Sequence, residues 1–257
     1  MVETSAASLQ DRYHLIERIS DKNAHGTIYI ATKADASRHF AVIKLPNSVQ
    51  DGLDISKEYH VMNDVGRHPN IIEMIEFNPA SPFYMATHFA KAKCLYSYLA
   101  EMKAGVTYQE KWSRYFFRQV IEGVLHLHRN GYAHMDLKID NIFCDYTLTP
   151  EPSLTAMVAD FGMVQLAESA GNAPVGNAYG PPEVVNRGST AFNFEKADVF
   201  ACSFILLALI AKSKLGDNWQ CQSEYYRFMQ EHGGKSRLIW PAFGVSPSAE
   251  FQDLLIR

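Results

Sequence analysis

The chain of 257 residues has few of the features that place a protein in a membrane, outside the cell or on a nucleic acid. Its most apolar run, residues 199–211, is shorter than the roughly 20 residues that span a bilayer, and it predicts a buried helix instead. The first residues lack the basic and apolar segments of a secretory signal. A net charge of −4 offers no broad basic surface, so we expect neither nucleic acid nor a membrane as a partner.

Cysteine is also scarce. The four cysteines form neither a Cys-x-x-Cys pair nor a dense framework: Cys94, Cys144, Cys202 and Cys221. Reduced thiols in the cytoplasm or the nucleus fit this pattern best, so we expect an intracellular protein.

Two short polar motifs stand in the middle of the chain. The first runs from His134 to Asn141 and contains Asp136, and the second is Asp160-Phe161-Gly162. A carboxylate can orient the proton of an attacking hydroxyl group, and amide and carboxylate oxygens can hold Mg²⁺ on nucleotide phosphates. Asp136, Asn141 and Asp160 therefore predict a magnesium-dependent site of phosphoryl transfer.

Further motifs occur in a matching order along the chain. Residues 41–44, Ala-Val-Ile-Lys, predict a strand that ends in Lys44, and Glu58 follows in a helical pattern that starts near Ser56. His-Pro-Asn-Ile at 68–71 suits the turn after that helix, and Pro-Pro-Glu at 181–183 lies downstream. The set resembles the eukaryotic protein kinase family, with its His-Arg-Asp, Asp-Phe-Gly and Ala-Pro-Glu motifs, over nearly the whole chain.

This resemblance implies an α+β, bilobal fold. We expect a small β-rich N-lobe at residues 1–87, a hinge at 88–90 and a larger, mainly helical C-lobe at 91–257. The C-lobe sequence stops without the family's usual last helix, which leaves Glu183 without an obvious arginine partner. Apolar patterns predict strands at 13–19, 27–33, 40–45, 72–77 and 83–89 and a helix at 112–128. The polar stretch at 145–154, which contains two prolines, predicts a surface loop.

The resemblance also implies the activity of a protein serine/threonine kinase, which transfers the γ-phosphate of Mg-ATP to a protein substrate. Asp136 would orient the substrate hydroxyl, and Lys138, typical of the serine/threonine branch, would stabilise the γ-phosphate. Asn141 and Asp160 would hold the metal. Lys44, paired with Glu58, would position ATP.

Positions that would contact the nucleotide follow from the same resemblance. They are Ile19, Gly26, Ile28, Ala41, Lys44, Thr87, His88, Phe89, Ala90, Cys94, Phe143 and Asp160.

The loop that should cover the phosphates departs from the family. Only Gly26 remains of three glycines, with Asp21 and Asn23 at the other two positions, or with Ser20 first if the loop carries an insertion. An acidic Asp21 would repel polyphosphate, so we expect weaker ATP affinity.

A second departure is Met135, which stands where the family has the arginine of His-Arg-Asp. A thioether cannot bind a phosphorylated loop as an arginine does. Residues 163–180 contain no lysine, arginine or threonine, and Ser169 and Tyr179 are their only hydroxyl residues. We therefore expect activity that is independent of loop phosphorylation.

An alternative function is a pseudokinase that acts as a nucleotide-binding scaffold. The degraded glycine loop and the missing last helix favour it. The presence of Lys44, Asp136 and Asp160 favours an active enzyme.

Overall fold

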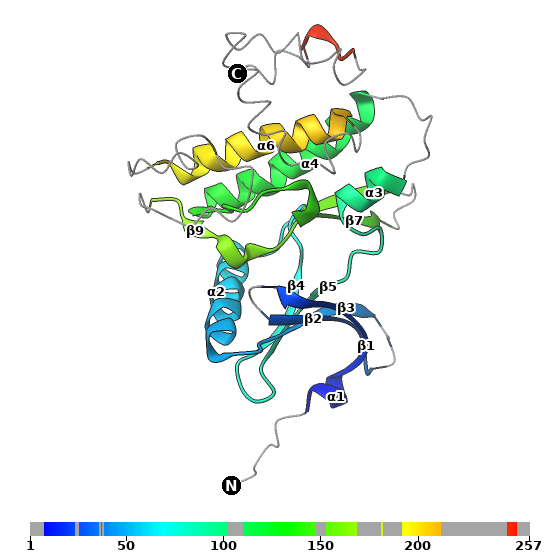
Figure 1. The fold of residues 1–257 in the computed structure, drawn as a ribbon, viewed down its shortest axis with the longest axis vertical. Coiled ribbons are helices and arrows are strands. Elements are labelled where there is room, and N and C mark those ends of the chain that lie inside the picture. The colour runs from blue at the N-terminus through cyan, green and yellow to red at the C-terminus, as the bar shows by residue number, and fades with distance from the viewer. Residues whose placement is uncertain are drawn as a thin grey trace. The chain divides into compact units, whose positions relative to one another are not determined.

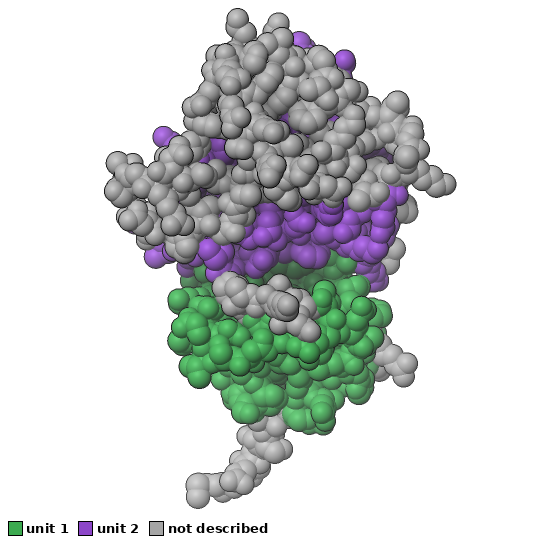
Figure 2. Space-filling model, in the orientation of Figure 1, with its two compact units in different colours: residues 1–90 green, residues 91–257 purple. Residues whose placement is uncertain are grey.

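The computed structural model describes residues 8–23, 26–35, 37, 39–101, 110–147, 153–168, 181, 192–211 and 246–250. The chain divides into two compact units, residues 1–90 and 91–257, which are coloured separately in Figure 2. Glu183, residues 169–180, Cys221 and the C-terminal residues 253–257 lie outside the described part, and so do the expectations that concern them.

The first unit is built on one antiparallel sheet (Figure 1). Its strands lie in the order β1-β2-β3-β5-β4, and a short helix, α1 (Leu9–Arg12), precedes them. The strand bounds are β1 Tyr13–Asn23, β2 Gly26–Lys33, β3 Phe40–Leu45, β4 Met74–Asn78 and β5 Tyr84–His88. All five predicted strands are present, although β1 runs further and β4 begins later than the pattern indicated.

Helix α2 (Val49–Val65) connects β3 to β4. Its N-cap is Ser48, whose side chain accepts a hydrogen bond from the backbone N–H of Asp51 at 3.1 Å. Gly66 ends the helix with φ of +70°, a conformation that glycine adopts without strain. The helix starts seven residues before the predicted Ser56. Its first turn, which follows the Ser48 cap, contains Gly52, and this poor helix former obscured the helical pattern in the sequence.

The second unit is mainly helical. The α-helices in its described part are α3 (Leu95–Glu101), α4 (Glu110–Arg129) and α6 (Phe194–Ala211), and α4 packs against α6 (Figure 1). The two predicted helices are confirmed as α4 and α6. No helix in the described part of the chain is long and apolar enough to cross a membrane.

Short strands complete this unit. β6 (Tyr132–Ala133) pairs with β9 (Gln165–Leu166), and β7 (Ile142–Thr147) pairs with β8 (Ser153–Val158). The predicted loop at 145–154 is wrong at both ends, because the hairpin pairing extends to Thr147 and Ser153. The combination of a β-rich unit and a mainly helical unit confirms the predicted α+β class.

Candidate active site

The loop between β6 and β7 holds a buried carboxylate. Asp136 is 5% exposed, and its Oδ2 accepts hydrogen bonds from Lys138 Nζ at 2.8 Å and from Asn141 Nδ2 at 2.9 Å. Asn141 Nδ2 also donates to the backbone oxygen of Asp136 at 2.9 Å. The side chains of the first motif therefore form one hydrogen-bonded group around Asp136.

The second motif is joined to the first. His134 Nδ1 accepts from the backbone N–H of Asp136 at 3.2 Å, so its Nε2 carries the hydrogen and donates to the backbone oxygen of Ala159 at 3.1 Å. The His134 ring lies 5.3 Å from that of Phe161, centroid to centroid. These contacts bring Asp160 next to the loop that carries Asp136.

Asp160 itself has an unusual backbone, with φ of +67°. A non-glycine residue in this region indicates a conformation that the surrounding structure imposes. Its carboxylate is solvent-exposed and makes no hydrogen bond or ion pair with a described residue. It remains available for a ligand.

A buried aspartate that the sequence analysis missed anchors the loop. Asp198 of α6 is 1% exposed, and it accepts backbone N–H bonds from His134 at 2.6 Å and from Met135 at 2.9 Å. Its Oδ2 also lies 2.9 Å from Nε2 of His128 at the end of α4. The sequence contained one signal of this role, because Asp198 directly precedes residues 199–211, the most apolar run of the chain.

In the first unit, the expected ion pair between β3 and α2 is present. Lys44 Nζ lies 2.5 Å from Glu58 Oε2, and the two side chains are 11% and 6% exposed. Burying two charges is costly unless they are paired, and this ion pair offsets part of that cost. The pair fixes the lysine against the helix.

The pleat of the sheet decides which side chains share a face with Lys44. Ile28 is the cross-strand partner of Lys44, and Val42 is the partner of Thr87. Cross-strand partners lie on the same face, and residues two apart on one strand also do. Ile28, Val42, Lys44 and Thr87 therefore line one face.

Ala41 lies on the opposite face. It is fully buried in a core cluster with Tyr13, Ile43 and Tyr84. The expectation that Ala41 lines the nucleotide site with Ile28 and Lys44 is wrong, because Ala41 stands three positions before the lysine on the strand, and an odd offset places two side chains on opposite faces. Val42, two positions before the lysine, shares its face.

Two further expected positions lie near the first strand connection. Ile19 stands at a bulge of β1, between the paired residues Arg18 and Ser20, and is 53% exposed. Gly26 opens β2 with φ of +120°. A Cβ at this position would collide with the carbonyl oxygen of Leu45, so glycine is required by the fold of the sheet itself.

The expected hinge, residues 88–90, begins at the last residue of β5. The backbone N–H of His88 donates to the oxygen of Glu73 at 2.9 Å, and the Phe89 ring lies 5.5 Å from that of Phe40. Ala90, the last residue of the first unit, is buried.

Cys94 and Phe143 meet in the second unit. They form an isolated antiparallel bridge just before α3. Cys94 is half-buried, and its Sγ lies 3.3 Å from Ser97 Oγ.

A model of the protein kinase domain matches residues 22–256. The chain belongs to the protein kinase family. CBL-interacting protein kinase 28 of Oryza sativa subsp. japonica is 31% identical over 217 residues, which cover 79% of this chain and 46% of that protein. NUAK family SNF1-like kinase 1 of Mus musculus is 28% identical over 214 residues, which cover 79% of this chain and 30% of that protein. The matched segment thus spans less than half the length of either relative.

Protein kinases use ATP with Mg²⁺, and the second unit contains suitable oxygen ligands. Both hydrogens of the Asn141 amide are engaged by Asp136, so its Oδ1 points elsewhere and has no donor among the described residues. With the exposed carboxylate of Asp160, this buried oxygen suits a hard cation. The described residues contain no group of three or more His, Cys, Asp and Glu side chains that could hold a metal ion.

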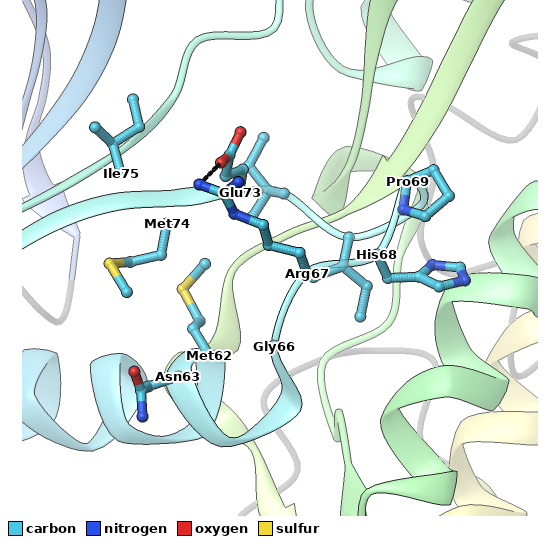
Figure 3. A pocket seen from close by; sticks show the side chains of 11 residues that line it. Met62, Asn63, Gly66, Arg67, His68, Pro69, Glu73, Met74 and Ile75 are labelled. Carbon is cyan, nitrogen blue, oxygen red and sulfur yellow. Dashed lines mark ion pairs between the residues drawn. The ribbon is translucent and has the colours of Figure 1, made fainter.

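A separate pocket of about 570 Å³ lies at the C-terminal end of α2. Figure 3 shows Met62 of α2 and Met74 of β4 extending into it, with the Arg67–Glu73 ion pair of 2.7 Å at its rim. Lys44 and Glu58 are not among its lining residues. A ligand there would touch the C-terminal end of the helix that carries Glu58 without contacting the Lys44–Glu58 pair.

Proposed function

We propose that the protein is a serine/threonine kinase that transfers the γ-phosphate of Mg-ATP to a protein hydroxyl group and needs no phosphorylation of its own loop. The proposal is carried by the Asp136 carboxylate, which Lys138 and Asn141 hold at 2.8 and 2.9 Å. A fixed carboxylate can orient a hydroxyl group for attack, which is the main protein contribution to phosphoryl transfer.

The remaining roles follow from the charges of the described side chains. Lys138 is 28% exposed and can contact a phosphate while it holds Asp136. Lys44, braced by Glu58, supplies a fixed positive charge for the α- and β-phosphates. Asn141 and Asp160 would hold Mg²⁺, which neutralises the charge that develops on the phosphate oxygens.

Independence from phosphorylation rests on the surroundings of Met135. This side chain is 4% exposed and lies in an apolar cluster, where no cation could receive a phosphate. Phosphatase treatment should therefore leave the rate of transfer unchanged. A large loss of activity would show that another cation takes the missing role.

We further propose a cytoplasmic or nuclear location, supported by the free thiols of the three cysteines that the structure describes, Cys94, Cys144 and Cys202. Microscopy of a tagged protein would test it, and localisation to a secretory compartment would contradict it.

The direct test of the function is Asp136→Asn. The amide keeps the shape but loses the proton acceptor, so ATP binding should persist while transfer falls by about 10²- to 10⁴-fold. Asp140→Asn, in the same loop and with the same change of charge, is the matched control and should retain transfer. Radiolabelled ATP with a generic protein substrate measures the rate, and calorimetry measures nucleotide binding.

Equal transfer by the Asp136→Asn variant and the unaltered protein would refute the role of Asp136. Binding of ATP without any transfer by the unaltered protein would instead identify the alternative, a nucleotide-binding scaffold.

A further inference from the structure

Met135 is surrounded by apolar side chains. Ala133, Phe194 and Ala197 form a buried cluster with it, and the partly buried Met163 and Phe192 pack against this cluster. Phe192 also lies 5.1 Å from Phe194, ring to ring. The Met135 side chain therefore lies in an apolar environment.

Members of the cluster come from separate stretches of the chain. Met135 belongs to the loop between β6 and β7, Met163 follows the Asp160 motif, and Phe192 and Phe194 lie just before α6 and at its first residue. Contact with Met135 therefore ties three stretches together at one point next to Asp136.

The backbone at Met135 is also unusual. Its φ is +64°, a left-handed conformation that is unfavourable for a residue with a Cβ. Its N–H donates to Asp198 Oδ1 at 2.9 Å, and the next N–H, that of Asp136, donates to His134. A buried side chain and a buried hydrogen bond together hold a conformation that the free chain would avoid.

We propose that Met135 is a positioning residue. By packing in this apolar cluster, its side chain holds the left-handed turn that places Asp136, and it does so without a charged partner. The inference deepens the proposed function, on which its kinetic test rests.

Three substitutions separate the side chain from the backbone. Met135→Leu keeps an apolar side chain of similar volume, Met135→Ala removes most of it, and Met135→Gly removes it while favouring positive φ. Leu154→Ala is the matched control, because Leu154 is also buried, at 8% exposure, but lies on β8 outside the cluster.

We expect kcat to fall by about 10²-fold in the alanine and glycine variants, since small displacements of a catalytic group have effects of this order. KM for ATP should change less than about twofold, because the lysine that grips the phosphates lies in the other unit. The leucine variant should keep kcat within about threefold.

A second readout does not depend on activity. Hydrogen exchange in the alanine variant should accelerate at the Met135 and Asp136 amides while amides of α4 and α6 keep their protection. Exchange that accelerates everywhere, or nowhere, would overturn the proposal, as would unchanged kcat in the alanine variant.

These experiments distinguish failure of the proposed kinase function from failure of the positioning role of Met135. If the unaltered protein transfers no phosphate, the kinase assignment fails, and hydrogen exchange alone then decides whether Met135 holds the loop. Local acceleration at Met135 and Asp136 would still support the positioning role, and its absence would refute it.

Discussion

Replacing Asp198 by asparagine tests whether one buried carboxylate holds the loop that carries Asp136 in place. The carboxylate accepts three hydrogen bonds, from the backbone N–H groups of His134 and Met135 and from the His128 ring, at 2.6, 2.9 and 2.9 Å. An asparagine has one acceptor oxygen, so its amide nitrogen must face at least one of these donors.

The magnitude follows from what the amide cannot satisfy. A hydrogen bond to a charged group contributes about 1.5–3 kcal/mol, and a buried donor without a partner costs about 1–3 kcal/mol. We expect Asp198→Asn to lower the free energy of unfolding by about 2–4 kcal/mol. At about 2–4 °C per kcal/mol for a domain of this size, Tm should fall by about 5–15 °C.

The assay combines thermal unfolding with phosphate transfer at saturating ATP, measured well below the lower Tm. Transfer per folded molecule should fall at least tenfold, because the loop that carries Asp136 loses an anchor. Glu195→Gln, on the first turn of the same helix, is the control and should change stability by no more than about 0.5 kcal/mol. Unchanged transfer by folded Asp198→Asn would refute the reasoning even if Tm fell.

The other predictions concern single contacts. Gly26→Ala should lower the free energy of unfolding by about 2 kcal/mol or more, because φ is positive and the new Cβ meets backbone; an unchanged denaturant midpoint would contradict this. Glu58→Gln should weaken ATP binding about tenfold, or about 1.4 kcal/mol, by freeing the β3 lysine, and calorimetry that shows equal affinity would make the ion pair dispensable. Burial raises the pKa of Cys144 to about 12 and also raises that of Cys202, so alkylation of the native protein near pH 8 should leave both unmodified and reach the half-buried Cys94 first. Peptide mapping checks the order, and excess Mg-ATP should slow the labelling of Cys94 if it lies at the nucleotide.

The Lys44–Glu58 pair and the Asp136 group could be predicted because their residues stand in motifs whose order along the chain is diagnostic. Their partners are close in sequence or joined by a recognised element. The face of the sheet on which Ala41 lies could not be predicted in the same way. Successive side chains of a strand point to opposite faces, so an alignment that is wrong by one residue moves a side chain from the core to the site.

Asp198 and the surroundings of Met135 required the structure. Their contacts join residues about 60 positions apart, and no local pattern encodes such a distance. The start of α2 was hidden for a local reason, since its first turn contains Gly52, which is a poor helix former.

Because β3 is pleated, neighbouring residues of this strand are under different kinds of selection, for folding on one face and for the site on the other. Val42 and Ile43 are neighbours in the sequence, yet Ile43 is fully buried in the core cluster while Val42 shares the face of Lys44. Changes at Ile43 act first on folding, whereas changes at Val42 act first on whatever lies against the lysine. The specificity of this site and the robustness of its sheet can therefore evolve, or be engineered, at adjacent positions with little interference.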